Sequence, residues 1–572
     1  MNTFDYIIVG AGSSGCVVAN RLSADSRISV CLIEAGGRGK SPLVSIPAGI
    51  FGLYGNKKYD YSFTTVPQKH LNQRILNVNR GKALGGSSAI NSMVYIRGNR
   101  NDYDAWVALG CEGWGYDNVL PVFKKMEANQ LNQSAKYHGF NGELKVSNQQ
   151  DPNPVAKVFV AAGQAVGLPE NTDFNGPSQL GLGIYNVKQD RGQRVSSYTA
   201  FVQPIESRSN LAIMTRTQVI ALNIEGDTVS GLTVERAGVQ QQLHCNKEVI
   251  LCGGTILSPA ILLASGIGDK GELQQLGIDC KHHVPGVGEN LQDHIDSMVT
   301  VRSAKPDTIG LSIKSLLPHI LPAPFKYLLS RTGWWTTNYV EAGGFAYTKL
   351  VDRDNRKEEA RDNYKEKARD NYKEEAREDE RNNPSNTSAD PDVQFHFTPL
   401  YRSHRGKSFE WGHGYSVFTC VLRPLSTGSI KLANDGSKRN VLIDYNFFAH
   451  QQDQQTLVEG VKKAREILAA PEFDHLRGQE MAPGEHVQTD EQILEYLRDT
   501  ATTVYHPIGT CKMGTDALAV VHPMTLKVTG MANLRVMDAS VMPRITSGNT
   551  SAATMMIGER GAAMVLAQRH SS

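Results

Sequence analysis

The first 34 residues constrain the fold of this chain more than any other stretch. An apolar run at 5–9 is followed by Gly10-Ala11-Gly12-Ser13-Ser14-Gly15, and residues 16–22 then show apolar helical periodicity. A second apolar run, 27–33, ends in Glu34. This order predicts a buried strand, a glycine turn, a helix and a second strand, which is how a doubly wound nucleotide-binding sheet begins.

The spacing of the glycines has a mechanical reason. Gly10 permits a tight turn, Gly12 lets backbone approach a pyrophosphate, and Gly15 allows the helix to pack closely on the strand. The N–H groups of the helix start, at Ser13 and Ser14, would then face the phosphates. Glu34 lies where an acid accepts hydrogen bonds from the adenosine ribose, which disfavours NADP and leaves NAD and FAD open.

Two further segments carry the pattern of a cofactor site. Residues 79–95, "NRGKALGGSSAINSMVY", place small, flexible residues in a polar loop that could wrap an extended cofactor with backbone donors. Asn91 within it can both donate and accept. A second glycine turn, 253–268, follows the apolar run 248–251.

These two segments resemble the paired signatures of the glucose–methanol–choline (GMC) oxidoreductases, which use FAD. The likeness continues through residues 287–294, 538–543 and 547–552, so ordered motifs cover nearly the whole chain. Within the family the sequence is most similar to bacterial membrane-linked alcohol dehydrogenases acting on aliphatic alcohols, with choline dehydrogenase second. The resemblance implies an α/β fold with a discontinuous, Rossmann-like FAD-binding domain and a substrate domain of antiparallel sheet and helices.

The resemblance also implies which residues contact FAD. They are Gly10, Gly12, Ser13, Ser14, Gly15, Glu34, Ala35, Arg80, Leu84, Gly85, Gly86, Ser87, Asn91, Met93, Val94, Val219, Gly253, Asp538, Ala539, Asn549 and Thr550. Some relatives bind flavin covalently through a histidine just before the asparagine of the second segment. This chain has Ile90 there, so we predict non-covalent FAD.

By the same resemblance, residues 1–155, 208–298 and 504–572 would form the FAD-binding domain, and residues 156–207 and 299–503 the substrate domain. The alternating segments 415–422 and 428–432 predict strands of the substrate domain. Residues 352–390 are an insertion that contains an octapeptide repeated three times over 353–376. Its mixed charge and lack of an apolar stripe predict a low-complexity loop, either disordered or a solvated helix.

Alcohol oxidation by a flavin needs a group that removes the hydroxyl proton, and histidine suits this because its pKa lies near neutral. The resemblance places His506 at the position of the catalytic base, with Asn549 as ligand of the alcohol or alkoxide oxygen. The nearby Cys511 and Lys512 lack the spacing of metal ligands or a redox pair, so no metal is predicted. A buried, structural Cys511 is favoured.

Net charge, cysteine spacing and apolar stretches limit the kinds of partner and cellular location expected for this protein. A net charge of +2 without a basic stripe argues against nucleic acid, and eight scattered cysteines without a C-x-x-C pair fit a reducing compartment. No signal peptide is expected, because an apolar strand is predicted to begin within the first ten residues. The most apolar long stretch, 316–329, is too short and too rich in proline to span a bilayer. For that stretch a buried cap is favoured over a lid on a membrane. These features predict a cytoplasmic protein, with peripheral binding to the inner face of the cytoplasmic membrane as an alternative.

The function predicted is FAD-dependent oxidation of a primary, aliphatic alcohol, with electrons passed to a quinone or another acceptor. Choline dehydrogenase is the rival, because Trp334, Trp335, Tyr339 and Glu341 could cage a quaternary ammonium, although a packed strand region is favoured there. A hydroxynitrile lyase, in which flavin does no redox work, and a silent flavin-binding protein are further alternatives.

Overall fold

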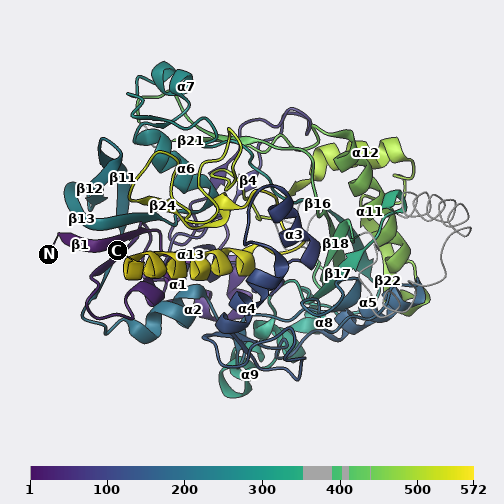
Figure 1. The fold of residues 1–572 in the computed structure, drawn as a ribbon. Helices are drawn as coiled ribbons and strands as arrows, with labels where there is room; N and C mark the ends of the chain where they lie inside the picture. Colours follow the sequence, from purple (N-terminus) through teal and green to yellow (C-terminus); the bar gives the residue numbers. More distant parts are fainter. Residues whose placement is uncertain (1, 352–389, 402–410, 438–439, 572) are drawn as a thin grey trace, which may run out of the picture.

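A computed structural model describes residues 2–351, 390–401, 411–437 and 440–571 (Figure 1). The predicted repeat insertion, apart from residue 390, lies outside the described residues. The rest forms two seven-stranded sheets flanked by helices, so the predicted fold class is confirmed.

The first sheet is built on the predicted N-terminal unit. Strand β1 (Thr3–Val9), helix α1 (Ser13–Leu22) and strand β2 (Val30–Glu34) follow in order, and β1 pairs parallel with β2 on one side and with β13 (Val239–Leu251) on the other. The sheet order is β10-β2-β1-β13-β12-β11, with β24 on β13. Its other strands are β10 (Leu211–Thr215), β11 (Thr217–Glu225), β12 (Thr228–Arg236) and β24 (Leu534–Val536). The C-terminal helix α13 (Ser551–Ser571) packs along α1 (Figure 1).

The second sheet pairs antiparallel in the order β22-β16-β19-β18-β17-β7, with β23 on β16. Its strands are β7 (Gly181–Ile184), β16 (Ile295–Ser303), β17 (Ala342–Ala346), β18 (Val393–Thr398), β19 (Gly414–Val421), β22 (Arg477–Ala482) and β23 (Thr502–Thr503). Helices α5 (Pro154–Ala165) and α11 (Gln451–Leu468) pack on it, as in the stacked ring pair Phe159–Phe397 at 4.6 Å. Helix α12 (Asp490–Thr500) packs against α11.

Shorter elements connect these layers. The helices are α2 (Pro42–Ser45), η1 (Pro47–Gly52), η2 (Gly86–Ala89), α3 (Arg100–Ala108), α4 (Tyr116–Met126), α6 (Gly254–Ala264), α7 (Lys270–Gln275), α8 (Ile313–Ser315), η5 (Leu316–Ile320), α9 (Ala323–Ser330) and η6 (Trp334–Thr336). Small two-stranded sheets join β5 (Glu127–Asn129) to β6 (Leu144–Val146) and β20 (Ser429–Leu432) to β21 (Val441–Asp444).

The strands of the first sheet come from three stretches separated in the chain, which fits the discontinuous domain expected. The exact limits, 1–155, 208–298 and 504–572 against 156–207 and 299–503, stay a prediction. The strands predicted at 415–422 and 428–432 correspond to β19 and β20.

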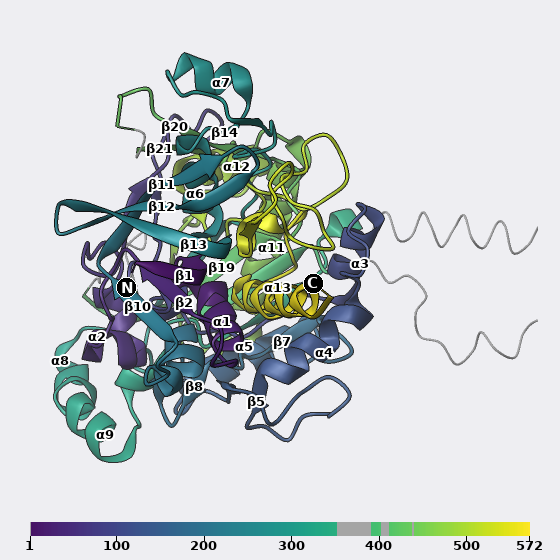
Figure 2. The same cartoon turned by 60° about the vertical axis from the view of Figure 1, so that its left-hand side comes forward.

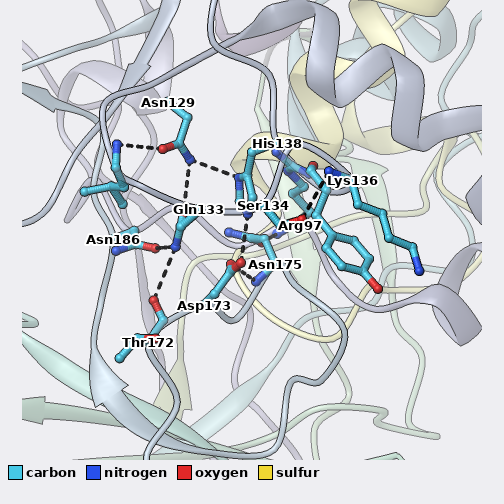
Figure 3. A network of polar contacts seen from close by, with 12 residues as sticks. Arg97, Asn129, Gln133, Ser134, Lys136, His138, Thr172, Asp173, Asn175 and Asn186 are labelled. Atoms are coloured by element: carbon cyan, nitrogen blue, oxygen red, sulfur yellow. Dashed lines mark hydrogen bonds and ion pairs between the residues drawn. The ribbon is translucent and has the colours of Figure 1, made fainter. Parts of the chain in front are cut away.

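A buried polar network joins the loop after β5 to the segment that precedes and follows β7 (Figure 3). The His138 imidazole lies 3.1 Å from Glu127 Oε1 through Nδ1 and 2.9 Å from Asp173 Oδ2 through Nε2. Gln133 Nε2 donates to Asn186 Oδ1 at 3.0 Å. Asn186 in turn accepts at its backbone oxygen from the N–H group of Tyr95, the last residue of the segment 79–95, so the network holds the end of that segment.

The apolar stretch 316–329 folds into η5 and α9, which lie at the molecular surface (Figure 2). Leu317 and Leu329 are 74% and 86% exposed, so the favoured prediction of a buried cap is wrong. Only the side of α9 that carries Ala323 and Tyr327 meets the protein. No helix within the described residues is both long and apolar enough to cross a bilayer.

Candidate active site

A cavity of about 890 Å³ lies between the two sheets. Its walls include Gly12 and Glu34 from the first sheet's glycine turn and the end of β2, and His396 and Phe418 from β18 and β19 of the second sheet. Ligands of doubly wound domains bind at the carboxyl ends of the parallel strands, which is where β1 and β2 meet this cavity. The cavity therefore is the candidate site for a nucleotide cofactor.

The three glycines of the N-terminal turn differ in what surrounds them. Gly10 has φ +102°, and a Cβ there would lie 2.4 Å from the Cys252 carbonyl oxygen. A Cβ on Gly15 would lie 1.9 Å from the Gly10 carbonyl oxygen. A Cβ on Gly12 would meet nothing nearer than 3.9 Å, although Gly12 lines the cavity. Gly12 alone thus leaves open space at the cavity wall, as backbone approach to a phosphate requires.

Two polar groups at this end of the cavity suit a nucleotide. Glu34 is buried, accepts from the Ala11 and Gly36 backbone N–H groups at 3.1 and 2.8 Å, and has its pKa raised to about 7 by burial. The Ser14 hydroxyl, at the start of α1, is buried and has no partner among the described residues. A pyrophosphate at this helix N-terminus would satisfy that hydroxyl. The residues present therefore fit FAD.

The structure brings nearly all predicted cofactor residues to this cavity. The exceptions are Gly15, Leu84 and Gly85, which lie just behind the wall. Gly85 donates its N–H to the Ala11 carbonyl and so braces the turn, whereas Leu84 donates to the Gly37 carbonyl, just after the end of β2. The predicted residues that line the cavity are Gly10, Gly12, Ser13, Ser14, Glu34, Ala35, Arg80, Gly86, Ser87, Asn91, Met93, Val94, Val219, Gly253, Asp538, Ala539, Asn549 and Thr550.

His506 and Asn549 meet at the other end of the cavity. His506 follows β23, and its backbone N–H donates to Asp293 Oδ1 at 2.8 Å. Asn549 lies two residues before α13, and its Nδ2 is 3.1 Å from His506 Nε2. Asn549 Oδ1 accepts from Gln394 Nε2 at 3.4 Å, which fixes the amide with its N–H groups toward His506.

A second histidine determines which nitrogen of His506 carries hydrogen. His294 Nε2 lies 3.1 Å from the Leu422 carbonyl oxygen, which can only accept, so this nitrogen carries the hydrogen. Burial lowers the pKa of His294 to about 3, so its Nδ1 is an acceptor. That acceptor lies 3.0 Å from His506 Nδ1, which must therefore be the protonated nitrogen of a neutral His506. His506 Nε2 therefore carries the lone pair, and in this structure it accepts from Asn549 Nδ2 at the cavity wall.

Burial, and then the adjacent His294, lower the pKa of His506 well below its ordinary value. A base acts in its unprotonated form, which exists above its pKa, and a lowered pKa extends that form toward acid. We expect kcat/KM of the holoenzyme to stay level as the pH falls from 8 through 6.5. Its acid limb should begin below the ordinary imidazole range. Steady-state rates in constant-ionic-strength buffers measure this; an acid limb centred near 6.5 would contradict it.

The other side chains at the His506 end of the cavity are mostly aromatic. Phe51 packs edge-on against Tyr339 at 5.7 Å, and Tyr339 against Phe418 at 6.1 Å. Tyr54 lies 5.7 Å from Tyr505, and all five rings line the cavity. They come from four distant stretches of chain, and no local pattern in the sequence marked them, apart from Tyr339.

Two further titratable side chains face this end without a full set of partners among the described residues. Asp296 Oδ1 and His396 Nε2 are buried and unpaired there, and both residues line the cavity. Burial raises the pKa of Asp296 well above its usual range and lowers that of His396 to about 4, so both favour their neutral forms. The alternation of strand residues could have identified both as facing one side of the second sheet.

The remaining residues singled out in the sequence lie elsewhere. Cys511 is fully buried, as predicted, and Lys512 pairs with Asp516 at 2.8 Å. Of the residues considered for an ammonium cage, only Tyr339 lines the cavity; Glu341 instead accepts from Thr337 and the Asn153 N–H group. Among the described residues, no three His, Cys, Asp or Glu side chains group closely enough to hold a metal ion.

A nucleotide-binding sheet, an antiparallel second domain and a histidine–asparagine pair at the far end of their shared cavity define a two-domain flavin oxidoreductase. Family comparison agrees: residues 4–296 match the N-terminal model and residues 424–558 the C-terminal model of the GMC oxidoreductases. The chain belongs to the GMC oxidoreductase family, and its cofactor is FAD.

Similar proteins cover the whole chain. It is 40% identical over 565 residues to an alcohol dehydrogenase [acceptor] of Pseudomonas putida, spanning 98% of this chain and 96% of that protein. It is 36% identical to an oxygen-dependent choline dehydrogenase of Sinorhizobium fredii, over 99% and 96% of the two chains. Among solved structures, a variant of formate oxidase from Aspergillus oryzae superposes with a TM-score of 0.87 at 26% identity, covering 100% and 99% of the chains.

Proposed function

We propose that this flavoprotein oxidises a primary, aliphatic alcohol to the aldehyde and passes the electrons to a quinone or another acceptor. The observation that carries the proposal is the geometry of His506, whose Nδ1 lies 3.0 Å from His294 Nδ1 and whose Nε2 lies 3.1 Å from the Asn549 amide, at the end of the cavity away from the glycine turn. A lone pair and an N–H donor side by side suit the two demands of alcohol activation, which are removal of a proton and stabilisation of the oxygen left behind.

FAD, when bound, accepts the hydride of the carbinol carbon, which is chemistry that no side chain supplies. The alcohol hydroxyl would lie on the cavity side of the pair, within hydrogen-bond distance of both His506 Nε2 and Asn549 Nδ2, and would replace their direct 3.1 Å contact. His506 Nε2 removes the hydroxyl proton, and Asn549 Nδ2 donates to the developing alkoxide. The imidazolium formed on His506 keeps its Nδ1–H bond to His294, whose neutral ring accepts without adding charge.

The side chains that line the cavity indicate the class of alcohol. Five aromatic rings present an apolar surface to whatever follows the carbinol carbon, and the relative with 40% identity is named for alcohol oxidation. One observation favours the second candidate, choline. The Asp296 carboxyl faces the same end and, once ionised, would be a counter-ion for a quaternary ammonium among aromatic rings.

Anaerobic mixing of the holoenzyme with alcohols tests these assignments. Primary alkanols should bleach the flavin absorbance, and Asp296→Asn should leave that bleaching unchanged. Bleaching by choline alone, lost in Asp296→Asn, would assign the choline reaction instead. No bleaching by any alcohol would contradict both and favour a lyase or a silent flavoprotein. Reoxidation by a quinone rather than by oxygen would identify the acceptor.

We also predict that FAD is held without a covalent bond. Ile90 lines the cavity at the position where some relatives carry the linking histidine, and its side chain has no nucleophilic atom. Acid precipitation of the holoenzyme should release all flavin into the supernatant. Yellow colour retained on the washed precipitate would contradict this prediction.

A further inference from the structure

The segment 311–331, here called the apolar hairpin, presents an unusual surface. It contains α8, η5 and α9 and projects from the body of the protein near α2 (Figure 2). Six of its large apolar side chains are more than half exposed: Ile313, Leu317, Leu321, Phe325, Leu328 and Leu329. Contiguous exposed apolar surface of this kind marks a binding face rather than ordinary surface.

The hairpin is anchored on one side and open on the other. Ala323 and Tyr327, one helical turn apart in α9, are buried against the protein, and the Tyr327 hydroxyl donates to the Gly192 carbonyl at 3.0 Å. Phe325 and Leu329 lie on the opposite side of α9, where their side chains are 67% and 86% exposed. The apolar residues outside are thus held by a fixed scaffold.

The charge of the hairpin has one sign. No acidic residue occurs from 308 to 340, whereas Lys314, Lys326 and Arg331 lie within or directly after the exposed apolar set. Long basic side chains around an apolar face can extend to lipid phosphates while the apolar groups enter the acyl region. Trp411 lies outside the hairpin in sequence but is bridged to Leu311. It is 68% exposed, and tryptophan favours the bilayer interface.

We propose that the apolar hairpin docks this enzyme on the surface of a phospholipid bilayer with anionic headgroups. The charge pattern selects this occupant, because an apolar protein partner would not require basic residues throughout the apolar set. The proposal stands on the geometry of the hairpin and does not depend on which alcohol is oxidised.

The hairpin is joined to the cavity wall. Residues 334–336, directly after it, form η6, which packs on η1. Phe51 of η1 and Tyr339 touch at 5.7 Å and both line the cavity. Docking would therefore place the aromatic end of the cavity near the bilayer, from which an aliphatic alcohol or a quinone could reach it.

Sedimentation of the holoenzyme with large unilamellar vesicles tests the proposal. Wild-type protein should bind phosphatidylglycerol-containing vesicles and bind phosphatidylcholine vesicles more weakly. The double variant Phe325→Glu/Leu329→Glu should bind the anionic vesicles at least about tenfold more weakly. Both positions are exposed, so the variant should fold, which its FAD content reports.

Val239→Glu is the matched control, because Val239 is 59% exposed but lies on the β12–β13 hairpin of the first domain. It should bind vesicles as wild type does. Equal vesicle binding by wild type and the double variant would overturn the proposal. Absence of wild-type binding, with sedimentation velocity showing a dimer that the double variant loses, would overturn it too and assign the hairpin to self-association.

A separate observation concerns Lys188. Its side chain is fully enclosed, and among the described residues no carboxylate lies within ion-pair distance; its Nζ donates to Ser551 Oγ at 2.7 Å. Its backbone N–H donates to the Met93 carbonyl at 2.9 Å. Ser551 begins α13, and both Ser551 and Met93 line the cavity. Burial, and then the neighbouring Arg194, lower the pKa of Lys188 to about 7, because a buried cation without a counter-ion is costly; an anionic partner would favour the charged form.

We infer that Lys188 is a positioning residue that supplies positive charge, through Ser551, to the flavin ring when FAD is bound. The ring belongs at this end of the cavity because the glycine turn and Glu34 occupy the nucleotide end, while His506 and Asn549 lie beside Ser551 in the wall. A reduced flavin carries more negative charge than an oxidised one, so this charge should favour reduction.

The affinity of the oxidised holoenzyme for sulfite, which adds to electron-poor flavins, tests this inference without turnover. Lys188→Met and Lys188→Gln should each bind sulfite about tenfold or more weakly and show a lower flavin midpoint potential. FAD content and Tm should identify any variant that fails to fold. Unchanged sulfite affinity and potential in either FAD-loaded variant would overturn the inference.

Discussion

Replacing His506 with alanine should lower kcat about 10²–10⁴-fold while the variant retains a full complement of FAD, because a positioned general base contributes that much. His506 lies at the end of the cavity away from the glycine turn, so its loss should spare nucleotide binding. Rapid-reaction measurement of anaerobic flavin reduction isolates the step. Flavin absorbance after purification reports the cofactor.

His294→Leu is the informative companion variant. It leaves the base in place but removes the acceptor of the His506 Nδ1–H bond, so Nε2 is no longer assigned the lone pair. We expect a smaller loss, about 10–100-fold, by analogy with removal of the hydrogen-bond partner that orients a metal-bound histidine. Near-normal reduction in His506→Ala would remove His506 from the mechanism. An unchanged rate of flavin reduction in His294→Leu would contradict the orienting role of His294.

Gly12→Asp should abolish FAD binding and leave the polypeptide folded. The Cβ at Gly12 has room, with its nearest neighbour 3.9 Å away, but the added carboxylate would enter the cavity at the start of α1. That position is where a pyrophosphate meets the helix N-terminus, so like charges would repel. We expect a colourless protein whose FAD dissociation constant rises at least about a hundredfold, measured by fluorescence titration.

Two neighbouring substitutions separate cofactor loss from unfolding. Gly12→Ala adds only a methyl group and should weaken FAD binding less than Gly12→Asp. Gly15→Ala places a Cβ 1.9 Å from the Gly10 carbonyl and should lower Tm or prevent expression. A yellow, fully loaded Gly12→Asp variant would show that the pyrophosphate does not lie at this turn.

Much of the fold could be predicted because its signals are local. The strand, turn, helix and acid of residues 5–34 occur in sequence order, and they became β1, α1 and β2 with few changes at their ends. The alternation at 415–422 likewise became β19. The stretch 316–329 was misjudged because hydrophobicity alone does not say which side of the protein it faces, and most of its large side chains face out.

In the candidate site, too, residues in local motifs could be predicted and residues brought together by long-range contacts could not. His506 and Asn549 could be predicted through the family motifs that contain them, and the structure brings them to 3.1 Å. The role of His294 could not, because its contact with His506 joins residues 212 positions apart and depends on a carbonyl of a third segment. Lys188 belongs to no recognised sequence motif. Its burial, which suggests a role, is visible only in the folded structure.

The cavity's walls come from both sheets, and this has a thermodynamic consequence. A ligand that binds only the folded chain adds RT ln(1 + [L]/Kd) to its free energy of unfolding. At free FAD a thousand times its dissociation constant the gain is about 4 kcal/mol, a large share of the stability of an ordinary domain. FAD would thus act as shared core for the two domains, and a cell's flavin supply would govern how long the enzyme survives as well as how fast it works.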